Sequence, residues 1–215
     1  MRIKTINVTS TGSEVPVEFT IERIPRATVL GYVDTDKERR NEWCLRGTPC
    51  GKYGKRACCP PSVKMFHDLP AKKWLYAVQV KILLDDYYDV YPNVNESKSK
   101  IYFGMDGSHK MTRNLQNKIS SALSIKHKSQ GFRVGGCLGC QYEKSGTCKN
   151  FMPALEATGV DVCKLAKYVL GNPIEWRPEK GQGYQDEMIA IGGIYTNDVI
   201  TKEEFERMIV DVCKR

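Results

Sequence analysis

The stretch that decides the fold runs from Lys73 to Leu84 and reads KWLYAVQVKILL. Tyrosine, valine and isoleucine are enriched in it, and its apolar and polar positions partly alternate, as they do in β-strands. We therefore expect the latter part of this stretch to form the central strand of a sheet.

Further β-like runs lie before and after this stretch. Val15–Ile21 alternates with a period of two, and Thr28–Val33 is a second such run. Met188–Tyr195 reads as a buried strand and Phe132–Val134 as a short one. Together these runs predict several strands on both sides of the central one.

Helical patterns occupy other parts of the chain. Between Ser108 and Ile125 apolar residues recur at every fourth position, which predicts an amphipathic helix with Asp106 or Ser108 as its N-cap. Further helices are expected from about residue 161 to residue 170 and after Thr201, which caps the last one.

Two segments between these elements read as irregular backbone. Asp85–Ser99 is an acidic loop, and Glu42–Ser62 is rich in glycine and proline, so a bound metal rather than strand pairing would hold it. Helices and strands do not alternate strictly along the chain. We therefore predict an α+β fold, with helices packed on a single mixed sheet, cysteine-rich loops, and one domain over residues 1–215.

The composition is that of an ordinary folded protein. Of the 215 residues, 41% are hydrophobic and 27% are charged, which argues against a disordered or fibrous chain. The N-terminus lacks the apolar run of a signal peptide, and no stretch approaches the length of a membrane span. We therefore expect a cytoplasmic protein that does not enter a membrane.

The net charge is positive, with a formal value of +8. This excess is compatible with an acidic acceptor protein or with nucleic acid. The lysines are scattered rather than gathered in a block, however, and each four-thiolate metal site would subtract about two charges. The sequence therefore supports nucleic-acid binding only weakly.

Nine cysteines are the most informative chemical feature, and eight of them fall into two groups. The first group contains Cys44, Cys50, Cys58 and Cys59, and the second contains Cys137, Cys140, Cys148 and Cys163. Thiolates select zinc, copper(I) and iron–sulfur clusters over hard cations. The alternative is a disulfide framework, but that belongs to secreted chains and pairs an even number of cysteines, so metal or cluster binding is favoured.

Neither of two common metal motifs is matched in full. A zinc ribbon needs two C-x2-4-C knuckles, and only Cys137-x2-Cys140 has that spacing. The bacterial ferredoxin run C-x2-C-x2-C-x3-C-P would need a cysteine where Glu143 stands. A site assembled from noncontiguous cysteines is therefore the better interpretation, and the two groups form either one site or two.

Several residues near these groups have open roles. Glu143 is either a labile ligand or proton donor of a cluster, or a surface residue. Cys58 and Cys163 either complete a site or are small buried hydrophobic residues. Cys213 lies outside both groups and is expected to be a core or an incidental cysteine rather than a ligand. The three histidines match no metal spacing and are expected at the surface or in a polar part of the core.

The segment Ala154–Val162 lies between Cys148 and Cys163 and reads ALEATGVDV. Gly159 and Glu156 would line a site beside the cluster under one interpretation. The commoner interpretation makes Gly159 a turn residue with positive φ and Asp161 the N-cap of the next helix.

Three motifs carry a resemblance to a known family: Cys50-x2-Tyr53-Gly54-x4-Cys59-Pro60-Pro61, Gly136-Cys137-x2-Cys140-x7-Cys148, and Pro153–Val162. Over roughly residues 40 to 165 the chain resembles the largely uncharacterised, predicted metal-binding proteins grouped as domain of unknown function 2284. The resemblance implies six metal or cluster ligands, namely Cys44, Cys50, Cys59, Cys137, Cys140 and Cys148. Many relatives have a further cysteine where this chain has Glu143, which leaves the number of ligands per site open.

Three functional classes are consistent with these patterns. The first is an iron–sulfur protein with one or two 4Fe–4S clusters that transfers electrons to a redox partner protein. The second is a cluster-dependent enzyme, or a sulfur- or cluster-delivery factor, with an open iron site. The third is a zinc-stabilised binding module. We rank the first class highest. The resemblance implies metal or cluster binding in anaerobe-like metabolism, and no catalytic residue is recognisable.

Overall fold

The computed structural model describes residues 1–8, 12–43, 53–54, 58–91, 98–135, 152–174 and 186–214. Five strands form its sheet: β1 (Arg2–Val8), β2 (Glu14–Pro25), β3 (Trp74–Leu83), β4 (Gln130–Phe132) and β5 (Glu187–Thr196). The helices are α1 (Arg26–Leu30), α2 (Lys37–Trp43), α3 (Leu84–Val90), α4 (Lys98–Lys126), α5 (Val162–Leu165) and α6 (Lys202–Cys213). Short 3-10 turns η1 (Phe66–Asp68) and η3 (Glu156–Thr158) and the π-helical turn η4 (Ala166–Leu170) complete the described elements.

The strands are arranged in the order β1-β2-β3-β5-β4, so β3 is central as predicted. Its Val78 lies opposite Ile21 of β2 and Gly192 of β5. The predictions of an α+β fold and of a single sheet are confirmed. The sheet is not mixed, however, because every described strand pair is antiparallel. Between β2 and β3 the chain leaves and re-enters the sheet at the same end, since Trp74 pairs with Pro25. After β3 it re-enters at the other end, because β4 pairs with Gly193–Tyr195 of β5, whereas Leu83 pairs with Glu187.

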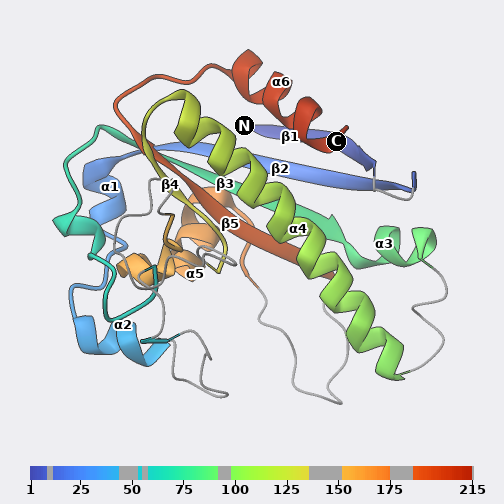
Figure 1. Ribbon diagram of the computed structural model, residues 1–215, viewed down its shortest axis with the longest axis horizontal. Helices are drawn as coiled ribbons and strands as arrows, with labels where there is room; N and C mark the ends of the chain where they lie inside the picture. The colour runs from blue at the N-terminus through green and yellow to red at the C-terminus, as the bar shows by residue number, and fades with distance from the viewer. Residues whose placement is uncertain are drawn as a thin grey trace.

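One face of the sheet is covered by α3, α4 and α6 (Figure 1). The alternating residues of β3 that point to this face pack with apolar residues of α4 and α6 in one core: Tyr76, Val78, Val80, Ile82, Leu115, Ile119, Leu123, Phe205 and Ile209. Burying each large apolar side chain contributes about 1.5–3 kcal/mol to folding. The apolar stripe predicted for the helix at 108–125 is therefore the contact that places α4 on the sheet.

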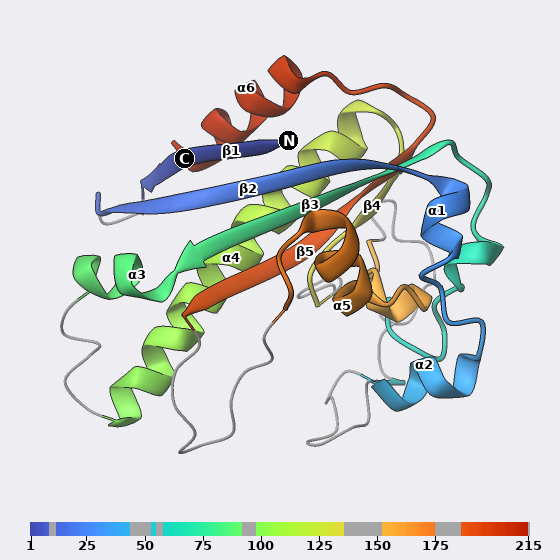
Figure 2. The ribbon, with the colours of Figure 1, turned by 180° about the vertical axis from the view of Figure 1, so that it is seen from behind.

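The opposite face is covered at one end by α1, α5 and η4 (Figure 2). Leu75, Ala77, Ile191 and Tyr195 of the sheet pack there with Val29, Phe66, Leu165 and Leu170. The rings of Phe66 and Tyr195 lie 4.9 Å apart between centroids. This second core supports the segments that carry the cysteine motifs.

Helix α4 also buries a polar stripe that the sequence did not reveal. Ser108, Thr112, Gln116, Ser120 and Ser124 recur every four residues and are buried. A Cβ atom at position 192 would overlap the Gln116 amide, so a glycine there lets α4 approach β5 closely. The predicted N-caps are wrong, because α4 begins at Lys98 and Ser108 lies inside it.

Two further local predictions are wrong. The run Thr28–Val33 is not a strand: α1 follows Pro25, and Val29 is buried in the core of the second face. Burial on that face overrides the strand propensity of the run. The predicted loop Asp85–Ser99 contains α3 and the start of α4, because Leu84, Tyr87 and Tyr88 pack into the first core.

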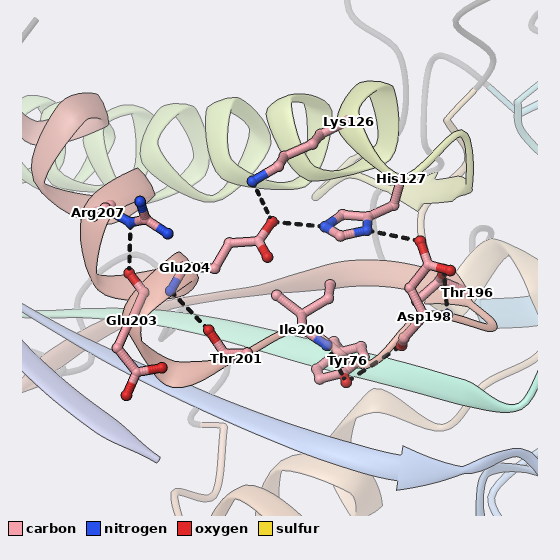
Figure 3. A network of polar contacts seen from close by, with 10 residues as sticks. All are labelled: Tyr76, Lys126, His127, Thr196, Asp198, Ile200, Thr201, Glu203, Glu204 and Arg207. Carbon is pink, nitrogen blue, oxygen red and sulfur yellow. Dashed lines mark hydrogen bonds and ion pairs between the residues drawn. The ribbon is translucent and has the colours of Figure 1, made fainter.

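A network of polar side-chain contacts joins the end of α4 to α6 (Figure 3). The His127 ring places Nδ1 2.8 Å from Asp198 Oδ2 and Nε2 2.8 Å from Glu204 Oε1, and Lys126 Nζ lies 2.7 Å from the same Glu204 oxygen. We call Lys126, His127, Asp198 and Glu204 the α4–α6 clasp. Thr201 caps α6 as predicted, accepting a hydrogen bond from the Glu204 N–H.

The clasp shifts the titration of one of its carboxylates. Burial acts to raise the pKa of Glu204, but hydrogen bonds from Lys126 and His127 outweigh it and hold the pKa below its usual value. The ionised form is therefore the one that the folded protein favours.

Among the described helices, none is long and apolar enough to cross a membrane.

Candidate metal centre

The Cys-Pro-Pro turn, residues Cys58–Val63, carries the one predicted ligand that the structure describes. Cys58 is buried, whereas Cys59 is partly exposed. The Val63 N–H donates to the Cys59 carbonyl over 3.3 Å, and the Gly54 N–H donates to the Pro60 carbonyl over 2.9 Å. The turn is therefore closed on itself and holds the preceding Tyr53-Gly54 turn against it.

Helix α2 is tied to this turn by a buried arginine. Only 2% of Arg40 is exposed, and its Nη1 donates to the carbonyls of Val63 at 3.0 Å and Ala157 at 3.3 Å. Its Nε and Nη2 donate to Asn41 Oδ1 at 3.2 and 3.0 Å. We call Arg40, Val63 and Ala157 the Arg40 junction. It joins the end of α2, the Cys-Pro-Pro turn and η3 at one place.

The two ends of the second cysteine stretch are also held together. The Arg133 N–H donates to the Pro153 carbonyl over 3.0 Å. The Val134 N–H donates to side-chain carbonyls of Gln116 at 3.2 Å and Asn117 at 3.0 Å, both on α4. The chain thus enters and leaves residues 136–151 at neighbouring points.

Met152 connects this second cysteine stretch to the Cys-Pro-Pro turn. Its side chain is buried against Cys58 and Cys59. The Met152 sulfur accepts a hydrogen bond from the Ser121 hydroxyl at 3.7 Å, and that hydroxyl oxygen accepts from the Arg133 guanidinium at 2.6 and 3.0 Å. The Cys-Pro-Pro turn and the exit of the second cysteine stretch therefore lie in contact.

The segment after Met152 is fixed by its turns. Gly159 has a φ of 87°, and the Asp34 N–H donates to its carbonyl over 2.8 Å. Asp161 accepts from the Lys164 N–H at 3.0 Å and caps α5. Both predictions for this segment, the glycine turn and the aspartate cap, are confirmed.

Glu156 of η3 has an altered titration. Burial raises the pKa of its carboxyl to about 7, although a hydrogen bond from its own backbone N–H acts in the opposite direction. A carboxyl with this pKa can hold or release a proton near neutrality. Its role beside a metal centre stays a prediction.

Most predicted ligands lie outside the described residues: Cys44, Cys50, Cys137, Cys140 and Cys148, together with Glu143. Among the described residues, no group of three or more histidine, cysteine or acidic side chains is arranged to hold a metal ion. Cys163 is partly exposed in α5. Cys213 is in the core, as predicted, and burial raises the pKa of its thiol to about 11.

Sequence reasoning missed the residues that hold this region together. Arg40 stands beside Arg39 in a polar helix, and no local signal separates the two. Gln116 and Asn117 read as polar positions of an amphipathic helix, yet both are buried. The sequence offered one hint of this burial. Gln116 is polar, yet it lies next to Leu115 and three positions before Ile119, on the side of the helix that was expected to be buried.

One comparison with known proteins gives a match. The sequence profile of the family described as predicted metal-binding protein (DUF2284) matches residues 32–194. No curated protein and no solved structure matches the chain.

Proposed function

Because the chain belongs to this family of predicted metal-binding proteins, we propose that it binds a 4Fe–4S cluster through cysteine thiolates and transfers electrons to a partner protein. The proposed ligands are Cys44, Cys50, Cys59, Cys137, Cys140 and Cys148. Six thiolates suffice for one fully ligated cluster with two to spare, or for two clusters that each need a further ligand.

The observation that carries the proposal is the meeting of three stretches of chain. The Arg40 junction ties the end of α2 to the Cys-Pro-Pro turn and η3, and Met152 packs on Cys58 and Cys59. Cys44 follows α2 directly, and Cys148 precedes Met152 by four residues. This supports a site to which both cysteine groups contribute.

The chemistry of the donors favours a soft metal. Cysteine thiolates bind iron–sulfur clusters and zinc, whereas hard cations prefer oxygen ligands. Uneven cysteine spacing speaks against a zinc ribbon and for a cluster assembled from separate segments. The formal net charge of +8, from which each four-thiolate centre subtracts about two charges, is compatible with docking to an acidic redox partner.

A second candidate function rests on Glu156. A carboxyl whose pKa is raised to about 7 by burial lies one residue from Ala157, which accepts from Arg40. A group that exchanges protons near neutrality is what a cluster-dependent enzyme with an open iron site would use. This observation favours the enzyme as the alternative to a simple electron carrier.

Anaerobic purification followed by iron, acid-labile sulfide and zinc assays tests the proposal. We expect a brown protein that contains iron and sulfide and whose visible absorption bleaches on reduction. Colourless protein with stoichiometric zinc would support a zinc-stabilised module instead. Protein that takes up neither metal after reconstitution would contradict a metal-binding function altogether.

A further inference from the structure

Arg40 is a cation in an unusual position. Its side chain is almost fully buried, with 2% exposed, at the end of α2. Its neighbour Arg39 shows the ordinary arrangement: 60% of that side chain is exposed, and Nη1 lies 3.3 Å from Asp34 Oδ2. Burying a guanidinium is costly unless the group is well hydrogen-bonded, so this position needs a reason.

The contacts of Arg40 show what it joins. One nitrogen donates to both the Val63 and Ala157 carbonyls, and these two residues lie in segments far apart in the sequence. Val63, Ala154 and Ala157 also form a small apolar cluster. Arg40 therefore ties the turn that contains Cys59 to the segment between Cys148 and Cys163.

The charge of Arg40 fits the proposed centre as well. A metal ion or cluster held by four thiolates carries a net negative charge, which a nearby buried cation stabilises. Arg40 places a permanent positive charge one hydrogen bond from Val63, whose N–H in turn donates to the Cys59 carbonyl.

We propose that Arg40 is the positioning residue of the metal centre: it holds the Cys-Pro-Pro turn against η3 and supplies positive charge beside an anionic thiolate site. This inference rests on the proposed metal-binding function. Groups that support a metal site without ligating it commonly change metal affinity by 10–100-fold when replaced.

Three variants test the inference: Arg40→Met, Arg40→Lys and, as a matched control on the same helix, Arg39→Met. Metal affinity is measured by competition with a chelator and, for an iron–sulfur protein, the reduction potential by anaerobic titration. We expect R40M to bind its metal at least about tenfold more weakly and to have a lower potential, because removing a cation disfavours the added electron. R40K should retain most of the potential, and R39M should match the wild type.

Wild-type protein in the same assays separates the two proposals. If it binds no metal, the proposed function fails, whatever Arg40 does. If it binds metal and a folded R40M has wild-type affinity and potential, the role of Arg40 is refuted. If R40M does not fold, the R40K variant tests the inference, because lysine cannot reproduce the several hydrogen bonds of the guanidinium. A several-fold loss of metal affinity in R40K would then support the proposed role of Arg40, and wild-type affinity would overturn it.

Discussion

The α4–α6 clasp and the Arg40 junction each join three parts of the chain, but they do so through different kinds of polar contact. In the clasp, lysine, histidine and carboxyl side chains contact one another at 2.7–2.8 Å (Figure 3). In the junction, one guanidinium donates to two backbone carbonyls and to the side chain of Asn41. The clasp completes a core that large apolar side chains already stabilise. The junction stands beside a much smaller apolar cluster, so the second region depends more on polar contacts and, we propose, on a metal.

Replacing Cys59 with alanine should show the largest difference between the two regions, in metal content. Under the proposed function it removes a ligand and should abolish or at least halve the metal content, measured as iron, sulfide and zinc per chain. The matched control is Cys213→Ala, since Cys213 is buried in the core that the clasp completes. The control should keep full metal content. Equal metal content in both variants would exclude Cys59 as a ligand.

Replacing Ile119 with alanine should damage the apolar region without touching the polar junction. Ile119 is fully buried against the sheet, and such a truncation costs about 2–5 kcal/mol of unfolding free energy. Chemical denaturation measures the loss. Val199→Ala, at a side chain that is 61% exposed, should change stability by less than about 0.5 kcal/mol. A similar small loss for Ile119→Ala would mean that α4 does not anchor the sheet.

The same contrast explains how much the sequence revealed. The central strand, the apolar stripe Leu115, Ile119 and Leu123, and the Thr201 cap depend on local patterns, and each was predicted. Thr28–Val33 was misread because burial against the second face outweighs the strand propensity of single residues. The Arg40 junction depends on contacts between residues 23 and 117 positions apart, which no local pattern encodes.

Glu156→Gln should change how stability depends on pH in the junction region. The folded protein holds the pKa of this carboxyl at about 7, above its ordinary value of 4.5. Between these values the folded state binds the proton and the unfolded state does not, so stability falls as pH rises, by at most about 3 kcal/mol. Glutamine abolishes this dependence. Denaturation midpoints at pH 4.5, 6 and 8 measure it, and parallel curves for both proteins would refute the shift.

Glu204→Gln should have the smallest effect, and one of opposite sign with pH. Because the folded state lowers the pKa of Glu204, its contribution is fully present above the ordinary value of 4.5 and is lost as pH falls through the folded-state pKa. We expect a loss of about 1 kcal/mol at pH 7 that shrinks on acidification. Glu203→Gln, an exposed neighbour in the same turn, is the control and should change stability less. A loss of stability that persists unchanged at pH 3 would show that the clasp acts through packing rather than charge. The two regions would then differ only in the size of their apolar cores.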